Sequence, residues 1–465
     1  MRIHNTKFVC TLGPASDDLK TLEKLMQNGM DVARLNFSHG SYKHHSMLIK
    51  NVRKAAKSVG VPVAIMQDLQ GPKIRIGDIG DEGIKIKKGE NIILTCGPKS
   101  KTKIPVQYKK LYKITKKGNI LLVDDGLIEL KVVAIKGKDI HCKAQNNSVI
   151  NSNKGINVPD ASITVSPITP KDKKDLLFGL KNDIDYVALS FVAEAKNIHD
   201  LRKIIKNRKK NVKIVAKIER KSAIENLEEI IEASDALMVA RGDLGMEIGP
   251  EKVPIVQKEM IRLCNLAGKP VITATHMLQS MVSSPKPTRA EVSDTANAIF
   301  DHSDAIMLSN ETAVGNYPIR AIKMFADTAK AVENELIKHN KLLPIRDIPS
   351  HTFLYDALGY HTCKLAETIK ADNIIILSAS GKSARFVSKH RSYIPTIVIT
   401  NSEKTRNQLA LQWGLNKIMV AKLKNKKSID ELRKLLIKKN CMKKGQKAVV
   451  LHAMSDEKHI VSLVV

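Results

Sequence analysis

Eight short apolar runs recur along the chain, and most are followed by a stretch whose apolar residues have helical spacing. The runs end in polar residues and lie at 7–11, 32–36, 63–68, 186–190, 213–219, 236–243, 271–275 and 305–309. Amphipathic segments lie between them, for example at 18–29, 195–207 and 253–268. Strands that alternate with helices favour a parallel sheet. Eight such units predict an α/β fold built on a closed (β/α)₈ barrel.

One interval interrupts this rhythm between the third and fourth runs. Its early part alternates apolar and polar residues with a period of two, at 83–95, 119–135 and 139–145, with turn residues between. This pattern is typical of hairpin strands. We expect a small β-barrel domain inserted after barrel strand three, where it would cover the active-site face as a lid.

After residue 345 the pattern of strands and helices starts again. A helix is expected at about 353–370, followed by alternating strands and helices up to the segment 459–465. This favours a separate C-terminal α/β domain with a small, mostly parallel sheet. The expected division is therefore a barrel at 1–71 and 167–344, a lid domain at 72–166 and a C-terminal domain at 345–465.

The formal net charge of +30 raises the question of a nucleic-acid partner. Lys residues outnumber Arg nearly fourfold and are spread along the whole chain, and only 4% of residues are aromatic. Nucleic-acid surfaces favour Arg and stacking aromatic side chains, so we expect no nucleic-acid partner. The densest basic run, 206–213, fits a solvated helix end. The charge instead favours anionic small molecules.

The other compositional features indicate a cytoplasmic protein. The six Cys residues are scattered and include no Cys-x-x-Cys pair, which indicates neither a disulfide framework nor a structural zinc site. No apolar run approaches the roughly 18 residues that a membrane span needs. The N-terminus moves directly into strand-like sequence, so we expect no signal peptide and no membrane partner.

Polar side chains at the ends of the expected barrel strands are candidates for the active site, because a barrel places its reactive groups there. Lys217 and Glu219 are two residues apart on one strand and would face the same side. Together with Asp243 from the next strand, Glu219 supplies half of a hard-cation site of the kind that holds Mg²⁺. Lys217 and Arg34 would then face an anionic phosphate. The alternative is a structural Lys217–Glu219 ion pair with Asp243 as a helix cap.

Several longer strings carry a family resemblance. They include Cys-Thr-Leu-Gly-Pro-Ala-Ser at 10–16 and Met-Val-Ala-Arg-Gly-Asp-Leu-Gly-Met-Glu at 238–247, with others at 33–40, 216–219, 267–271, 287–298 and 306–313. In this order they resemble the pyruvate kinase family over essentially the whole chain. The resemblance implies transfer of the phosphoryl group of phosphoenolpyruvate to ADP, giving pyruvate and ATP in the last step of glycolysis. It also implies a homotetramer.

The resemblance assigns roles to individual positions. Lys217 would stabilise the phosphoryl group in flight and Arg34 would contact it, while Glu219 and Asp243 would bind Mg²⁺, for which Mn²⁺ can substitute. Gly242 and Thr275 would line the site of the substrate carboxylate, with Thr275 near the face where the enolate is protonated. Contacts to the nucleotide phosphates would come from Arg75, Lys154 and His39.

The chain departs from the family pattern near the monovalent-cation site. Asn36, Ser38 and Asp68 resemble ligands of K⁺ in potassium-dependent members, but those members commonly have Glu where Lys73 stands. An ammonium at Lys73 would supply positive charge in place of K⁺, so we expect no K⁺ requirement. The alternative is that Lys73 points to solvent and K⁺ still binds.

A second departure concerns regulation. The segment Ser378–Ser383, between an expected strand and helix, resembles the phosphate loop of sugar-bisphosphate-activated members. The stretch 452–459 lacks the Gly-rich loop, Trp, Arg and Pro that often accompany it there. We expect weak or absent activation by fructose-1,6-bisphosphate, with some other phosphorylated effector at this loop. An ordinary helix cap by Ser380 or Ser383 is the alternative.

Two competing functions remain at this point. One is another enolate-handling barrel that uses Mg²⁺ without ADP, which would need neither Arg75 and Lys154 nor the inserted domain. The other is a basic nucleic-acid-binding protein on a barrel scaffold, which would tolerate loss of Lys217 and bind with a steep salt dependence.

Overall fold

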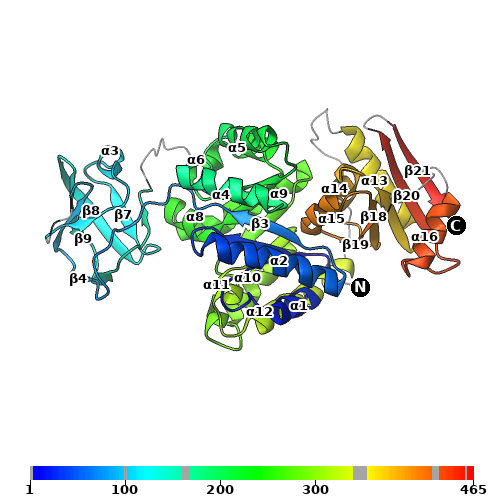
Figure 1. Ribbon diagram of the computed structural model, residues 1–465, viewed down its shortest axis with the longest axis horizontal. Helices are drawn as coiled ribbons and strands as arrows, with labels where there is room; N and C mark the ends of the chain where they lie inside the picture. The colour runs from blue at the N-terminus through cyan, green and yellow to red at the C-terminus, as the bar shows by residue number, and fades with distance from the viewer. Residues whose placement is uncertain are drawn as a thin grey trace.

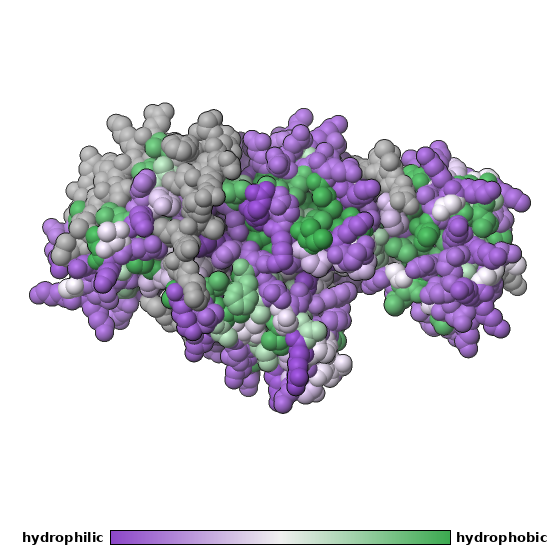
Figure 2. Space-filling model, turned by 180° about the vertical axis from the view of Figure 1, so that it is seen from behind, coloured by the Kyte–Doolittle hydropathy of each residue, from purple (hydrophilic) through white to green (hydrophobic). Residues whose placement is uncertain are grey.

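The chain forms three bodies arranged in a row, with the barrel in the middle, the inserted domain on one side and the C-terminal domain on the other (Figure 1). The structure is a computed structural model. It describes residues 4–98, 100, 102–159, 167–338, 353–421, 429–455 and 458–464. Seen from behind, hydrophilic side chains cover most of the described surface, with smaller hydrophobic patches between them (Figure 2).

Eight parallel strands close into a barrel in the order β1-β16-β15-β14-β13-β12-β3-β2. Their bounds are β1 Lys7–Thr11, β2 Met30–Asn36, β3 Ala64–Asp68, β12 Tyr186–Leu189, β13 Lys213–Ile218, β14 Ala236–Ala240, β15 Val271–Ala274 and β16 Ala305–Leu308. Nearly every strand residue is buried, as expected where helices cover the outer face of a parallel barrel. Each predicted apolar run therefore coincides with most of a barrel strand.

Helices follow the barrel strands and bury one face against them. They are α1 Leu19–Gln27, α2 Tyr42–Val59, α4 Pro170–Lys181, α5 Ala195–Asn207, α6 Lys221–Glu225, α7 Leu227–Ala233, α8 Arg241–Ile248, α9 Val253–Ala267, α10 Arg289–Phe300, α11 Asn310–Ala313 and α12 Pro318–Lys338. Capping residues in the local sequence determine where several of these helices begin. Thr169 and Asp172 form a capping box at α4, and Thr288 and Glu291 form another at α10.

The inserted domain has its own apolar core, separate from that of the barrel. A six-stranded sheet runs β11-β7-β8-β9-β5-β6, and β10 pairs with β4 in a second sheet. The elements are β4 Ile84–Ile86, β5 Asn91–Thr95, β6 Ile104–Pro105, α3 Leu111–Ile114, β7 Ile120–Val123, β8 Ile128–Lys136, β9 Asp139–Ala144, β10 Ser148–Ile150 and β11 Ile156–Asn157. Along β8 buried and exposed residues alternate, which is the period-two pattern of its sequence.

The C-terminal domain is a five-stranded sheet in the order β19-β18-β17-β20-β21, in which only the β20–β21 pair is antiparallel among the described strands. Its elements are α13 Phe353–Thr368, β17 Asn373–Leu377, α14 Lys382–Lys389, β18 Thr396–Thr400, α15 Glu403–Gln408, β19 Leu415–Val420, α16 Ile429–Lys438, β20 Ala448–Ser455 and β21 Lys458–Val464. Separate apolar clusters cover the two faces of this sheet.

The C-terminal domain packs on the N-terminal end of the barrel strands, away from the mouth. The Tyr186 hydroxyl, at the start of β12, donates to the Gln408 carbonyl at 2.6 Å. Arg391 pairs with Asp304, just before β16, at 3.1 Å. The lid therefore meets one end of the barrel and the C-terminal domain meets the other.

These observations confirm the predicted fold class. One local expectation is corrected: the expected strand run 236–243 stops at Ala240, and residues 241–243 form the first turn of helix α8. The proposed boundary at 344/345 and residues 160–166 beside the boundary at 166/167 lie outside the described residues. Among the described residues, no helix combines the length and hydropathy required to cross a bilayer.

Candidate active site

Lys217 lies near the end of β13 with its side chain almost buried, and its ammonium contacts three oxygens. Its Nζ lies 2.7 Å from Ser190 Oγ, 2.9 Å from Glu219 Oε1 and 3.3 Å from Asp68 Oδ1. The contact with Asp68 Oδ1 is an ion pair rather than a hydrogen bond. Burial alone would lower the pKa of Lys217, but Asp68 and Glu219 raise it above its ordinary value. The protein therefore holds a fixed positive charge at the barrel mouth.

Glu219 and Asp243 are the two carboxylates expected to bind a metal. Glu219 is 2% exposed, and its Oε2 accepts from the Phe191 backbone N–H at 2.7 Å. Burial raises the pKa of Glu219 and the charge of Asp243 raises it further, against the opposing effect of Lys217. Asp243 Oδ1 lies 3.3 Å from Lys73 Nζ. Each carboxylate is thus balanced by a lysine ammonium.

This donor set fits a hard divalent cation. Two carboxylates that repel each other electrostatically, each already facing a positive group, provide oxygen ligands of the kind Mg²⁺ takes. Mg²⁺ is usually bound by one or two carboxylates, with water and substrate oxygens completing its shell. In the described part of the chain, no three His, Cys, Asp or Glu side chains are grouped to share a metal ion. With two protein carboxylates, the remaining positions around such a cation fall to water and substrate oxygens.

Arg34 is positioned by neighbouring strands. In the barrel register Arg34 lies beside Thr11 of β1. Its guanidinium donates to Asp68 Oδ2 from Nε and lies 2.7 Å from the same oxygen through a second nitrogen, while a third nitrogen donates to Thr11 Oγ1 at 2.8 Å. Burial opposes ionisation of Asp68, but Lys217 and Arg34 hold its pKa below the usual value. Asp68 therefore aligns both cations of the mouth.

Gly242 and Thr275 lie together at the next two strand ends. The Gly242 N–H donates to Thr275 Oγ1 at 3.0 Å. Thr275 has φ 68°, a conformation that non-glycine residues rarely adopt. Arg241 secures it by donating to the Thr275 carbonyl at 2.7 Å while pairing with Asp294 at 2.7 Å. The surrounding contacts thus impose this strained backbone, as is common at functional sites.

The residues expected to contact the nucleotide come from the lid and from the loop after β2. One guanidinium nitrogen of Arg75 donates to the Asn153 carbonyl at 2.7 Å, and Arg75 forms a bridge with Gly155. The adjacent Lys154 pairs with Asp124 at 2.9 Å. Burial lowers the pKa of His39, and the charge of Arg75 lowers it further. The positive charge of Arg75 therefore disfavours the protonated form of His39.

The three residues expected at the potassium site also lie at the mouth. The register pairs Asn36 with Asp68, and Asn36 Oδ1 accepts from the Ser38 N–H at 3.1 Å. Among the described residues the ion pair of Lys73 is with Asp243, and its side chain is 24% exposed. Lys73 is therefore neither fully solvated nor paired with the proposed potassium ligands, and it neutralises a candidate magnesium ligand instead.

Sequence reasoning missed Ser190 and did not assign the positioning roles of Arg241 and Glu311. Ser190 accepts from Lys217 and donates to the Leu69 carbonyl at 2.7 Å. Glu311 is fully buried and accepts from the Ser309 and Leu278 N–H groups, which ties two strand ends together. A serine or an acidic residue at a strand end is too common to indicate such a role without coordinates.

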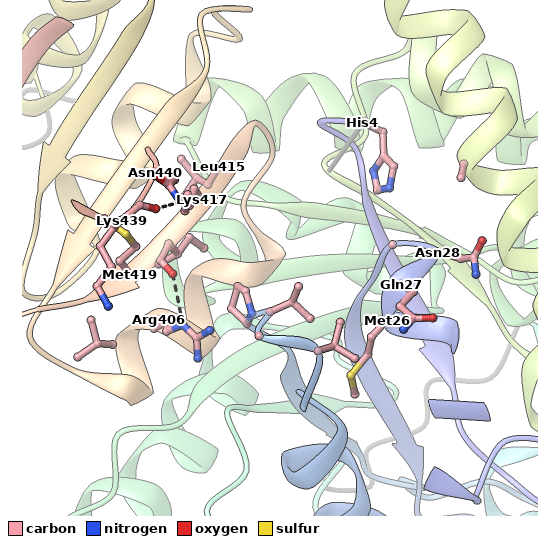
Figure 3. A pocket seen from close by; sticks show the side chains of 18 of the residues that line it. His4, Met26, Gln27, Asn28, Arg406, Leu415, Lys417, Met419, Lys439 and Asn440 are labelled. Atoms are coloured by element: carbon pink, nitrogen blue, oxygen red, sulfur yellow. Dashed lines mark hydrogen bonds between the residues drawn. The ribbon is translucent and has the colours of Figure 1, made fainter. Parts of the chain in front are cut away.

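One cavity of the described protein lies apart from this site. It measures about 950 Å³ and lies between the barrel, near His4 and residues 26–29, and β19 of the C-terminal domain. Figure 3 shows Arg406 donating to a backbone carbonyl and Lys417 donating to the Lys439 carbonyl within it. None of the residues at the barrel mouth lines this cavity. The candidate active site at the barrel mouth and this cavity therefore lie in different parts of the protein.

A barrel mouth with a buried lysine, an arginine and two adjacent carboxylates defines an enzyme that acts on a phosphorylated anion. A family model described as "Pyruvate kinase, barrel domain" matches residues 3–322, and one described as "Pyruvate kinase, alpha/beta domain" matches residues 356–461. The chain belongs to the pyruvate kinase family. It is a phosphotransferase that moves the phosphoryl group of phosphoenolpyruvate to ADP and yields pyruvate and ATP.

Individual relatives agree with this assignment. A pyruvate kinase of Clostridium acetobutylicum is 43% identical over 434 residues, 92% of this chain and 91% of the relative. One of Staphylococcus haemolyticus is 44% identical over 436 residues, 92% of this chain and 74% of the relative. The crystal structure of a pyruvate kinase from Cryptosporidium parvum superimposes with a TM-score of 0.89 at 33% identity, covering 99% of this chain and 96% of that chain.

Proposed function

We propose that Glu219 and Asp243 hold Mg²⁺, or Mn²⁺ in its place, and that Lys217 stabilises the phosphoryl group during transfer. The observation that supports this most is the Lys217 ammonium, which lies 2.9 Å from Glu219 in a nearly buried setting. The cation would supply charge neutralisation for the phosphate and for the enolate oxygen. Lys217 adds a fixed charge, which stabilises developing negative charge more effectively in a water-poor site than in solution.

Arg34 and Thr275 complete the substrate site in this proposal. Arg34 presents its guanidinium to the transferring phosphate, with Asp68 and Thr11 fixing its direction. Gly242 and Thr275 contact the substrate carboxylate, and Thr275 stands near the face on which the enolate takes up its proton. Because Gly242 lies in the first turn of α8, the helix dipole also favours an anionic group there.

The lid supplies the nucleotide contacts. Arg75 and Lys154 reach the phosphates of ADP from the lid, and His39 adds a contact from the barrel side. Closing the lid would bring these groups to the mouth and exclude water from it. The backbone pairing of Arg75 with Gly155, next to Lys154, supports a joint action because it holds both residues on one connecting ribbon.

We propose further that activity does not require K⁺, since Lys73 supplies a positive charge at the barrel mouth that carries Asn36, Ser38 and Asp68. The contact between Lys73 and Asp243 supports this proposal, because it holds the lysine ammonium within the mouth rather than in solvent. Asn36, Ser38 and Asp68 then serve as polar supports rather than as a required potassium site.

The loop Ser378–Ser383 is the proposed site of a phosphorylated effector other than fructose-1,6-bisphosphate. Gly381 has φ 85° and is the N-cap of α14, so this position has no side chain to cap the helix. Ser378 Oγ accepts from the Gly381 N–H at 3.1 Å and Ser380 Oγ from the Lys382 N–H at 3.4 Å. The Lys382 ammonium lies over the Tyr355 ring at 3.5 Å from its centroid. Part of the stretch 452–459, which bears on bisphosphate binding, lies outside the described residues.

The wider setting is proposed on the same basis. A homotetramer in the cytoplasm, without nucleic-acid partner, fits a glycolytic enzyme, and all six Cys residues are free thiols and buried. The division into a barrel at 1–71 and 167–344, a lid at 72–166 and a C-terminal domain at 345–465 fits the separate apolar cores.

The test of the metal site compares Glu219→Gln with the wild type. Pyruvate formation is followed with a coupled assay while Mg²⁺ is titrated at saturating ADP and phosphoenolpyruvate. Loss of the carboxylate charge should raise the Mg²⁺ concentration needed for half-maximal rate by at least about tenfold, because each charged ligand contributes strongly to such a site. Glu225→Gln, an exposed residue at the end of α6, is the matched control. An unchanged Mg²⁺ requirement in Glu219→Gln would refute the assignment.

A further inference from the structure

Lys73 forms an ion pair that joins the inserted domain to the barrel. It follows Gly71 and Pro72 in the segment that leaves β3, whereas Asp243 lies in the first turn of α8. Their charged atoms are 3.3 Å apart, and the side chains are 24% and 21% exposed. The contact is therefore partly shielded from water, which strengthens it relative to a pair on the open surface.

The stem of Lys73 packs against the ribbon that connects the lid to the barrel. A Cβ added to Gly155 would lie 3.1 Å from Lys73 Cε, so this glycine leaves room for the lysine stem. The two connecting segments pair through the Ile76 N–H and the Lys154 carbonyl at 2.8 Å, and through the Ile156 N–H and the Ile74 carbonyl at 2.8 Å. We call these two connecting segments, residues 72–77 and 154–157, the root of the lid. A displacement of Lys73 would therefore disturb the packing of this root.

We propose that Lys73 is an internal counter-cation of Asp243 that competes with the divalent metal for this carboxylate and ties the root of the lid to the barrel. This inference rests on the proposed metal site at Glu219 and Asp243. Asp243 Oδ1 already faces the Lys73 ammonium, so a metal ion bound to this carboxylate would share its single negative charge with Lys73, and the two cations would repel each other. Metal binding would therefore release the lid root from α8.

The two lysines of the mouth differ in what happens when a cation takes their carboxylate. Lys217 keeps Ser190 Oγ and Asp68 as acceptors if Glu219 turns to a metal. Lys73, in contrast, has its ion pair among the described residues with Asp243. It is therefore Lys73, rather than Lys217, that must move when the metal site fills.

The first test measures Mn²⁺ binding by electron paramagnetic resonance in the full-length protein without substrate or nucleotide. Lys73→Met keeps the side-chain length and removes the charge, so it should bind Mn²⁺ at least about threefold more tightly than the wild type. Lys85→Met, at an exposed lid lysine on β4, should leave the affinity unchanged. Equal or weaker Mn²⁺ binding by Lys73→Met would overturn the inference.

The second test follows the lid root by hydrogen–deuterium exchange of the backbone at 72–77 and 154–157. In the wild type, Mn²⁺ should speed exchange there, and in Lys73→Met exchange should be fast before metal is added. Exchange that does not respond to Mn²⁺ in the wild type would contradict the tether.

Asp243→Asn separates failure of the inference from failure of the metal site. If the wild type binds Mn²⁺ and Asp243→Asn loses that binding, the proposed metal site stands, and the Lys73 results judge the inference alone. A wild type that shows no saturable Mn²⁺ binding, or an Asp243→Asn variant that binds normally, would overturn both.

Discussion

Lys217 Nζ and Ser190 Oγ lie 2.7 Å apart, and the hydroxyl that accepts from the ammonium donates a hydrogen bond of its own to the Leu69 carbonyl. The serine thus links β12 and the end of β3 to the lysine that carries the fixed charge. Ser190 orients one of the three Lys217 N–H groups. We assign it no direct contact with the substrate. Ser190 is therefore a positioning residue.

Ser190→Ala should lower kcat about three- to tenfold with little change in KM for phosphoenolpyruvate, because a lysine that points in several directions stabilises the transition state less well. Steady-state kinetics of pyruvate formation measure this. Ser58→Ala, at an exposed position of α2, should behave as the wild type. A normal kcat in Ser190→Ala would show that Asp68 and Glu219 suffice to orient Lys217.

Lys73→Glu should make the enzyme potassium-dependent. The substitution restores the carboxylate that potassium-dependent members of the family commonly have there, and it removes the positive charge beside the mouth. The wild-type initial rate should stay constant when tetramethylammonium is replaced by K⁺ at fixed ionic strength, whereas Lys73→Glu should gain severalfold. A many-fold rise in the wild type would contradict the proposed K⁺ independence.

His302 should make the stability of the protein fall in mild acid. Burial lowers the pKa of His302 to about 4, and Arg391 contributes to the shift. In the unfolded chain the residue titrates near its ordinary value of 6.5. Between these values the unfolded chain binds a proton that the folded protein refuses, so stability declines as the pH falls from about 6.5 towards 4.

The measurement is the urea midpoint of unfolding at pH 7 and pH 5. His302→Asn removes the titrating group and tolerates the positive φ of this position. Its midpoint should fall less between the two pH values than that of the wild type. His199→Asn, at an exposed residue of α5, should leave the wild-type decline in place. An equal decline in His302→Asn would assign the acid sensitivity to other groups.

Gly359 should be intolerant of any side chain. A Cβ there would lie 2.7 Å from the Phe386 carbonyl oxygen, which is backbone of α14 and cannot move without shifting the helix. Gly359→Ala should destabilise the C-terminal domain by about 1–3 kcal/mol and lower its melting temperature. A Cβ at Gly97 would meet Thr95 Oγ1 at 3.4 Å and Lys138 Cβ at 3.9 Å, which are ordinary van der Waals contacts, so Gly97→Ala serves as the control. An unchanged melting temperature would mean that α13 and α14 separate easily.

The sequence predicted the barrel well, because most residues of each strand are apolar and each predicted run stops at a polar residue. Strand β1 coincides with the predicted run 7–11, and Lys217 and Glu219 lie where a period of two places them. Helix α8 was missed because Gly242 and Gly245 are poor helix formers. Its first turn is fixed by long-range contacts of Arg241 with Asp294 and Thr275, which no local pattern reveals.

The partners of the charged residues could not be predicted in the same way. The sequence indicated that Lys73 adds positive charge near the mouth, but the carboxylate that it meets depends on how the segment after β3 turns. The pairing with Asp243 joins residues 170 positions apart. The role of Asp68 between Arg34 and Lys217 likewise arises from the closure of the barrel, because three separate strands contribute the three residues.

The most direct test of the account is pyruvate formation by Lys217→Met, assayed with ADP and Mg²⁺ present and with each omitted in turn. Methionine preserves the length of the side chain and removes only the ammonium. The account predicts a fall in kcat of at least about 10³-fold in a variant that still folds and binds phosphoenolpyruvate, with Lys221→Met unaffected. A folded Lys217→Met variant that retains more than a tenth of the wild-type rate would contradict it.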